Sequence, residues 1–316
     1  MPNGPGKSHR KGLDLLELQD MFPNEQVATE WFEEVRWPNG RCCPRCGSTS
    51  TKIAKPSYNM PYLCNSCKKG FSVKYGTALQ KSNISLRKWA IAIYLEMTSL
   101  KSVSSMKLHR DIGVTQKTAW FMLHRIRDAF VTEKAEAFDG PVEVDETYFG
   151  GKRRNMKKSK REKMTGRGAV GKTAVVGAKD RKSNQVTAQV VQSTDSETLH
   201  GFVEKVTDPD ATVYTDSAKA YIGINRKHES VNHGIGEYVR DQAHTNGIES
   251  FWAMLKRAHK GTYHQISAKH LNRYVHQFAA KHNLREENTI EQMESVFARM
   301  VGKRIMYKDL VADAEA

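Results

Sequence analysis

Three acidic residues stand in sequence contexts where their carboxylates could share one site. Asp145 lies in the alternating run Val142–Glu146, which predicts a strand with Glu143 and Asp145 on the face opposite the valines. Asp216 ends a second predicted apolar strand, and Glu249 lies near the start of an amphipathic helix. These acids are far apart along the chain, so only the fold can bring them together.

A site built from three carboxylates would have a definite chemistry. Converging carboxylates repel one another, and hard cations such as Mg²⁺ relieve that repulsion. Two such ions at ~3.5–4 Å clamp the attacking and leaving oxygens of a phosphodiester during in-line displacement. Taken singly, each acid is more simply explained as a solvated surface group, so composition alone leaves this site as a hypothesis.

Four cysteines form a second group with chemistry, in two CxxC pairs. The pairs are Cys43 with Cys46 and Cys64 with Cys67, and 17 residues separate them. Each pair places two thiolates on one tight turn, and two such turns supply the four sulfurs of a tetrahedral Zn²⁺ site. Four thiolates close the coordination sphere, so this zinc would organise the fold and not catalyse. The alternative is a dithiol redox pair, and Cys42 cannot easily join the same site.

The charge of the chain indicates its partner. The 316 residues include 50 Lys+Arg against 35 Asp+Glu, a net charge of +15 that favours a polyanion, most commonly nucleic acid. No apolar run approaches the ~20 residues of a membrane span, and residues 1–12 lack the apolar core of a secretion signal. We therefore expect no membrane partner and a cytoplasmic, nucleoid-associated location.

The elements that must position these residues fall into successive segments. Apolar residues at helical spacing predict a helical preface at 13–40, followed by the zinc ribbon at 41–76. Residues 84–132 are predicted to be helical and to include a helix-turn-helix. Strands alternating with helices predict an α/β domain at 140–285, and a helical tail is expected at 286–316.

The helix-turn-helix prediction rests on the segment around Gly113. A helix at 102–112 would end there, and Thr115 can cap a second helix that runs to Phe130. The first turn of such a recognition helix reaches base edges in DNA. The alternative is an ordinary helical hairpin whose apolar residues simply pack. We expect DNA contacts from four residues of the second helix and its cap: Thr115, Gln116, Lys117 and Arg125.

One motif within the basic segment 151–172 is misleading. Residues Gly166–Thr173 match the phosphate-binding loop pattern G-x-x-x-x-G-K-[ST]. That loop must join a strand to a helix, so that amides and the helix dipole face the phosphates. Here a charged run precedes the motif and a strand follows it, so we reject an ATP site.

In its motifs the chain resembles bacterial insertion-sequence transposases of the DDE type, from the branch with an N-terminal zinc ribbon and helix-turn-helix. The resemblance covers most of the chain and rests on segments that occur in one order: Val144–Lys152, Gly166–Arg181, Tyr214–Ser217, His244–Lys256, Gly261–His264 and Tyr307–Leu310.

The resemblance implies a fold and a set of roles. It implies a multidomain α/β protein in which the zinc ribbon and helix-turn-helix precede an RNase H-like mixed-sheet catalytic domain. Asp145, Asp216 and Glu249 would hold two Mg²⁺ (or Mn²⁺) ions, with Asn246 as the alternative third residue. Lys256 would contact the phosphate of the element end, and Arg257 beside it is a further candidate DNA contact.

The expected function is therefore transposition. The protein would bind the terminal inverted repeats of an element as double-stranded DNA, cut the element ends and join them to target DNA. The reaction would need no ATP, and a homo-oligomer would bridge two ends. The competing interpretations are a zinc-ribbon and helix-turn-helix regulator without catalysis, and a metal-dependent nuclease without strand transfer.

Overall fold

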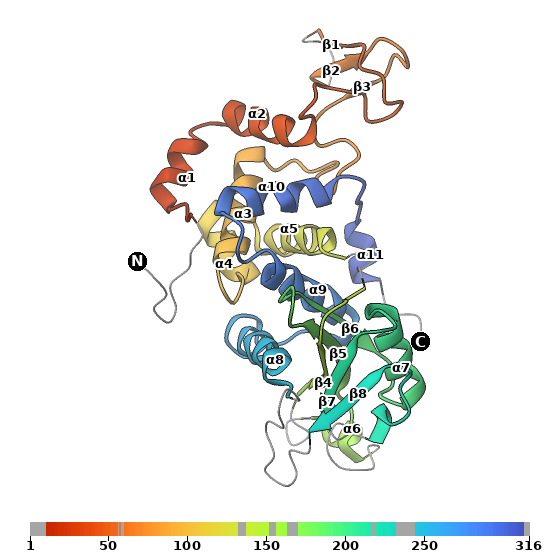
Figure 1. The fold of residues 1–316 in the computed structure, drawn as a ribbon. Helices are drawn as coiled ribbons and strands as arrows, with labels where there is room; N and C mark the ends of the chain where they lie inside the picture. The colour runs from red at the N-terminus through yellow and green to blue at the C-terminus, as the bar shows by residue number, and fades with distance from the viewer. Residues whose placement is uncertain are drawn as a thin grey trace. The chain divides into compact units, whose positions relative to one another are not determined.

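The structure is a computed structural model that describes residues 11–55, 57, 60–131, 137–151, 156–162, 170–216, 219–231 and 244–312. The chain divides into two compact units, one formed by Met1–Val131 with Leu284–Ala316 and the other by Thr132–Asn283. Figure 1 shows the elements of both. Every helix in the described part of the chain is too short or too polar to cross a bilayer.

The first unit contains seven helices and a small sheet within its described residues. The helices are α1 (Leu15–Met21), α2 (Glu25–Arg36), α3 (Leu86–Thr98), α4 (Ser105–Ile112), α5 (Gln116–Ala129), α10 (Thr289–Met300) and α11 (Tyr307–Val311). The strands β1 (Thr51–Ile53), β2 (Tyr62–Cys64) and β3 (Gly70–Phe71) form an antiparallel sheet in the order β1-β2-β3.

The predicted turn between α4 and α5 is confirmed. Gly113 ends α4 with φ 60°, a left-handed conformation that glycine adopts without steric cost. The Thr115 side chain accepts the N–H of Thr118 and caps α5, as the sequence indicates. Helix α4 begins three residues later than expected, because Ser104 is its N-cap and Ser102 has a positive φ.

The last segment of the chain belongs to the first unit. The ring of Phe297 in α10 lies 4.5 Å from the ring of Phe32 in α2, in an edge-to-face contact. The backbone N–H of Ala78 donates to Met300 O, and Thr77 bridges to Val301. Residues from both halves of the sequence therefore share one core.

The second unit is built on a mixed sheet. Its strands are β4 (Val142–Phe149), β5 (Thr173–Asp180), β6 (Val186–Val191), β7 (Thr212–Asp216) and β8 (Lys227–Val231). Its other elements are α6 (Lys158–Glu162), α7 (Ser196–Val206), the short helix η2 (Lys219–Tyr221), α8 (Asn246–Ala258), the π-helical turn η4 (His259–Tyr263) and α9 (Ala268–Asn283).

The strand order is β6-β5-β4-β7-β8. The three strands β4, β5 and β6 pair antiparallel, whereas β7 pairs parallel with both β4 and β8. The sequence predicts the first four of these strands and helix α7, and it misses β8. The sheet is covered on both faces, by α7 on one and by α8 and α9 on the other.

The two faces divide the side chains of β4 as the alternation predicts. Val142 and Val144 pack with Leu199 and Val203 of α7. The residues of β4 that alternate with these valines point to the opposite face of the sheet. On that face, apolar side chains of β5 and β6 pack with α8 and α9. Glu143 and Asp145 therefore lie on the face that α8 covers.

Candidate functional site

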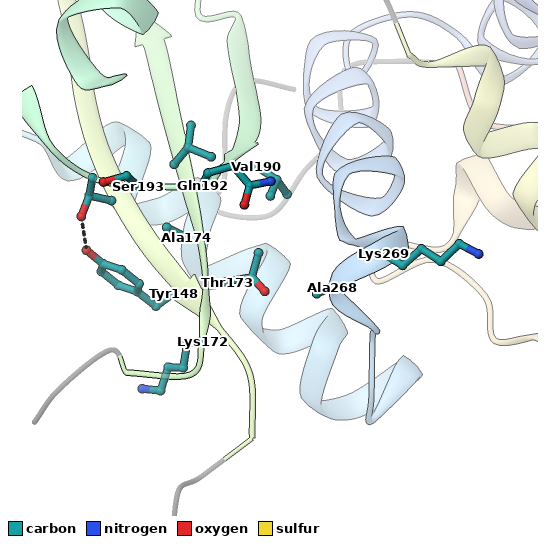
Figure 2. A pocket seen from close by; sticks show the side chains of 11 residues that line it. Tyr148, Lys172, Thr173, Ala174, Val190, Gln192, Ser193, Ala268 and Lys269 are labelled. Carbon is teal, nitrogen blue, oxygen red and sulfur yellow. Dashed lines mark hydrogen bonds between the residues drawn. The ribbon is translucent and has the colours of Figure 1, made fainter. Parts of the chain in front are cut away.

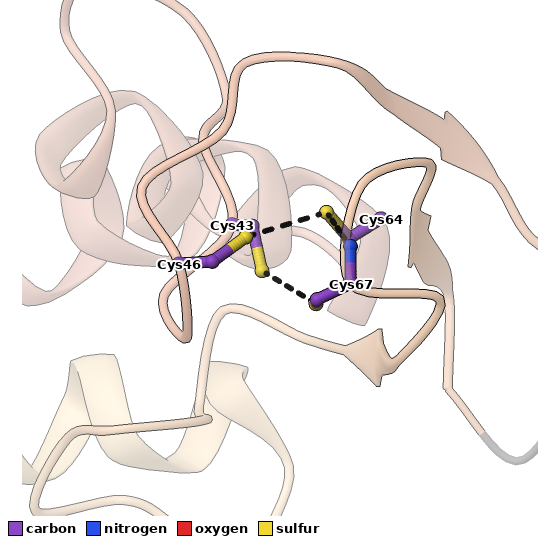
Figure 3. A group of neighbouring side chains, drawn as sticks. All are labelled: Cys43, Cys46, Cys64 and Cys67. Carbon is purple, nitrogen blue, oxygen red and sulfur yellow. Dashed lines mark hydrogen bonds between the residues drawn. The ribbon is translucent and has the colours of Figure 1, made fainter.

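The four cysteine sulfurs of the small sheet form one tight cluster. All four Sγ atoms lie within 4.8 Å of one another, and Figure 3 shows the two pairs facing each other. Cys43 Sγ is 3.7 Å from Cys67 Sγ, and Cys46 Sγ is 3.6 Å from Cys64 Sγ. A regular tetrahedron with Zn–S bonds of ~2.3 Å has edges of about 3.8 Å, so the donor set fits Zn²⁺.

Two of the three acids lie on neighbouring parallel strands. In the register of β4 with β7, Glu143 pairs with Tyr214. The pairing ends there, and Asp145 and Asp216 each follow two residues later on their own strand, so both point to the face of Glu143 and Tyr214. The charge of Asp216 contributes to the raised pKa of Asp145, which agrees with two carboxylates that are close enough to interact.

The electrostatic environment of Asp145 reflects this crowding. Burial raises the pKa of Asp145 to about 7, with further contributions from the negative charges of Glu146, Asp216 and Glu249. A cation with oxygen ligands relieves this kind of repulsion. The local chemistry of these acids therefore fits a hard divalent ion.

The third acid comes from the first turn of α8. Glu249 is exposed, and its Oε1 accepts the hydroxyl of Thr245 at 3.0 Å. Asn246, the alternative third residue, is also exposed in the same turn. Lys256 and Arg257 are exposed in the last turn of that helix, where the Arg257 Nε donates to Ala253 O.

The acids are less tightly gathered than the cysteines. Among the residues that the structure describes, only the cysteine group has three or more ligand atoms all within 4.8 Å of one another. Asp145 lies on the central strand β4, Asp216 ends the neighbouring strand β7, and Glu249 comes from a helix that packs on that sheet. The distance of the third acid from the other two therefore depends on the position of α8.

Sequence reasoning gave no role to two other acids on β4. Glu146 accepts the hydroxyl of the fully buried Tyr221 at 2.7 Å, and burial followed by the charge of Asp216 raises the pKa of Glu146. Glu143 has a side chain only 2% exposed and pairs with Arg181. The alternation of the strand predicted the face of Glu143, but nothing local predicted its partner.

The candidate DNA contacts of the helix-turn-helix fall into two classes. Thr115, Gln116 and Lys117 are exposed at the start of α5, and the Lys117 ammonium lies 4.5 Å from the ring centroid of Tyr307. Arg125 is only 8% exposed, lies over the ring of Phe121 and donates to Gln80 O. A DNA contact by Arg125 would require it to leave both of these partners.

A pocket of about 540 Å³ lies where β4 ends and β5 begins. The Tyr148 hydroxyl lies 3.3 Å from the Thr194 hydroxyl. Figure 2 shows the Lys269 side chain extending away from the pocket. None of the three acids lines it. The phosphate-loop match cannot be compared with this region, because Gly166–Ala169 lie outside the described residues, as do 152–155 and 163–165 of the basic segment.

Two segments of the chain match models of known protein families. Residues 137–283 match the family model of the ISXO2-like transposase domain, and residues 23–70 match that of the transposase zinc-ribbon domain. A relative in Halobacterium salinarum, described as an uncharacterized protein in the transposable element ISH50, is 28% identical over 291 residues. That alignment covers 87% of this chain and 96% of the relative.

Proposed function

We propose that this chain, which matches the ISXO2-like transposase domain over residues 137–283 and the transposase zinc-ribbon domain over residues 23–70, binds the ends of an insertion element and catalyses metal-dependent DNA strand cleavage and strand transfer. The observation that supports this proposal is that Asp145 and Asp216 lie on the paired parallel strands β4 and β7, and that the negative charges of Asp216 and Glu249 both raise the pKa of Asp145.

The fold proposed for the catalytic unit is RNase H-like. The sheet order β6-β5-β4-β7-β8, antiparallel through β4 and parallel beyond it, supports this assignment. The helices on both faces of the sheet agree with it as well. In this arrangement the central strand β4 carries Asp145.

We assign Asp145, Asp216 and Glu249 as the residues that would hold two Mg²⁺ or Mn²⁺ ions. Their donors are oxygens, and the raised pKa of Asp145 indicates a site that gains from added positive charge. Such ions stabilise the charge that develops on the attacking and leaving oxygens of a phosphodiester. The exposed Lys256 lies seven residues after Glu249 on α8 and would bind the phosphate of the element end.

The reaction would proceed in two displacements at phosphorus. Water first attacks the phosphodiester at the element end and leaves a free 3′-OH. That hydroxyl then attacks a phosphodiester of the target DNA and joins the strands, with no ATP and no covalent protein–DNA intermediate. A homo-oligomer would hold two ends together.

Recognition of the element ends is proposed for the first unit. The cysteine cluster would bind a structural Zn²⁺ and so organise the ribbon. The exposed Thr115, Gln116 and Lys117 at the start of α5 would reach the bases and phosphates of double-stranded DNA. Arg125, in contrast, would support the packing of α5.

The test is cleavage and joining of a labelled element-end duplex with Mg²⁺ or Mn²⁺. Wild type is expected to give joined product, and Glu249→Ala is expected to give none. If Asn246→Ala is inactive and Glu249→Ala is active, the enzyme class stands and the third ligand is Asn246. Binding without cutting would indicate a regulator, and cutting without joining would indicate a nuclease.

A further inference from the structure

We propose that Glu143 is a positioning residue that caps helix α8 from the neighbouring strand and so sets the distance between its first turn and Asp145. This inference rests on the proposed function, because it concerns how the third group of that site is held. It does not depend on whether Glu249 or Asn246 is that group, since both lie in the same turn.

The start of α8 lacks the usual local cap. In most helices the N-cap side chain accepts a backbone N–H of the first turn. The N-cap of α8 is Thr245, whose side chain makes no such bond and donates to Glu249 Oε1. The N–H of Ile248 instead donates to Glu143 Oε2 at 2.9 Å, so a strand residue 105 positions away supplies the cap.

The carboxylate of Glu143 contacts one residue that follows strand β5 and one residue that precedes helix α8. The Arg181 Nε, just beyond β5, donates to Glu143 Oε1 at 2.8 Å, and His244 Nδ1 lies 3.3 Å from the same oxygen. A second guanidinium nitrogen, Arg181 Nη2, donates to His244 O at 2.7 Å. Glu143 and Arg181 therefore tie the sheet to the residues that lead into α8.

Two glycines allow α8 to approach the sheet closely. One contact is at Gly247, before Glu249 in the helix, and the other is at Trp252, after it. A Cβ on Gly247 would lie 2.7 Å from Glu143 Oε2 and 3.0 Å from Lys179 Nζ. A Cβ on Gly177, which pairs with Asp145 across β4 and β5, would lie 2.7 Å from the ring of Trp252. Helix α8 therefore packs closely on the sheet both before and after Glu249.

A positioning role explains why an ionic group is buried here. Burying a carboxylate costs free energy, and an apolar residue of similar size stabilises a fold as well or better. An apolar residue could not accept the N–H of Ile248, however. The Glu143 carboxylate therefore fixes where the first turn of α8 rests on the sheet. Glu143 is two residues from Asp145 and on the same face of β4.

The test compares two glycine-to-alanine substitutions in helices of the same unit. Gly247→Ala forces the carboxylate of Glu143 away from the helix, whereas Gly201→Ala in α7 meets nothing within 4 Å. We expect Gly201→Ala to keep wild-type joining and Mn²⁺ affinity. We expect Gly247→Ala to lose joining by on the order of 10- to 100-fold, with element-end binding unchanged.

A readout without DNA accompanies the assay. Mn²⁺ binding to the full chain is measured by the loss of the free-ion signal in electron paramagnetic resonance, and the Tm of each variant is recorded. The expected result for Gly247→Ala is several-fold weaker Mn²⁺ binding, measured at a temperature well below a Tm that is a few degrees lower than that of wild type. Wild-type joining and Mn²⁺ affinity in Gly247→Ala would overturn the proposal, and so would losses that follow only from unfolding.

A second pair of variants tests the contact itself. Glu143→Gln keeps the shape but loses the charge, and it is expected to reduce joining as Gly247→Ala does. In the double variant Glu143→Asp with Gly247→Ala, the shorter side chain leaves room for the new Cβ. We expect this double variant to join faster than Gly247→Ala alone, and joining that is equal to or slower than that of Gly247→Ala would contradict a direct contact.

The two proposals fail in different ways. If wild type never cuts or joins DNA, yet Gly247→Ala weakens Mn²⁺ binding and Gly201→Ala does not, then the proposed function is wrong and the positioning role stands. If wild type joins DNA and Gly247→Ala matches it, then the positioning role is wrong and the proposed function stands.

Discussion

The cysteine cluster and the acidic residues are both candidate metal sites, but they are held by different means. The cysteines lie on two short turns, one before β1 and one between β2 and β3, and their sulfurs are within 4.8 Å of one another. The acids come from β4, β7 and α8, and their approach depends on strand register and on how α8 rests on the sheet. The positions of the four sulfurs are set by two local turns, whereas the positions of the three carboxylates are set by the fold of a whole domain.

The largest expected effect follows from Asp145→Asn, which removes one carboxylate from the central strand β4. Metal ions contribute several kcal/mol of transition-state stabilisation, so we expect joining to fall about a thousandfold or more. The ribbon does not share this residue, and zinc content should remain that of wild type. The measurement is joined product per unit time together with zinc analysis; substantial joining by this variant would contradict the assigned mechanism.

The converse experiment is Cys64→Ser, which removes one sulfur from the cluster. In zinc-finger peptides metal binding supplies ~10–16 kcal/mol, so the ribbon is expected to lose its fold and its protection from protease. Mn²⁺ binding by the acidic site should persist. Cys42→Ser is the matched control, because Cys42 lies outside the cluster, and its zinc content should match wild type.

A smaller effect is expected where α8 rests on the sheet. Gly177→Ala places a methyl group 2.7 Å from the ring of Trp252, and overpacking of this kind costs about 1–3 kcal/mol. We expect a Tm several degrees lower in differential scanning calorimetry, with ribbon zinc unaffected. Gly201→Ala serves again as the control, and an equal Tm for the two variants would show that the ring moves freely.

The smallest effect is expected in the ribbon, at a contact that does not involve the metal. The Arg41 guanidinium lies 3.9 Å from the ring centroid of Tyr62, an interaction worth about 0.5–1 kcal/mol at partly exposed sites. Arg41→Ala should therefore leave zinc content and the zinc-bound fold nearly unchanged in circular dichroism. Loss of zinc from this variant would mean that packing, and not the metal, holds the ribbon together.

The two sites also differ in how far the sequence predicts them. The cysteine spacing alone predicts the cluster, because each pair sits on one turn. The alternation in β4 predicts its bounds and its two faces, and the amphipathic pattern of α7 gives the bounds 196–206. Local periodicity is enough in these segments, since each packs one continuous apolar face against the core.

The remaining features depend on residues that are distant in sequence. Strand β8 is polar (Lys-His-Glu-Ser-Val) and lies at the sheet edge, so it lacks the apolar pattern that identifies a buried strand. The role of Glu143 depends on Arg181 and Ile248, which no local pattern links to it. Burial of Arg125 likewise follows from packing and not from its place in the helix.

The return of α10 to the first unit has a consequence for how this protein is made. Phe32 emerges from the ribosome long before Phe297, whose ring it contacts, and the whole of the second unit is synthesised between them. Domains fold as units during synthesis, so the sheet can form while the N-terminal helices still lack their partner. A chain that stops before α10 would keep the sheet and its acids but would not complete the helical core around α2 and α3.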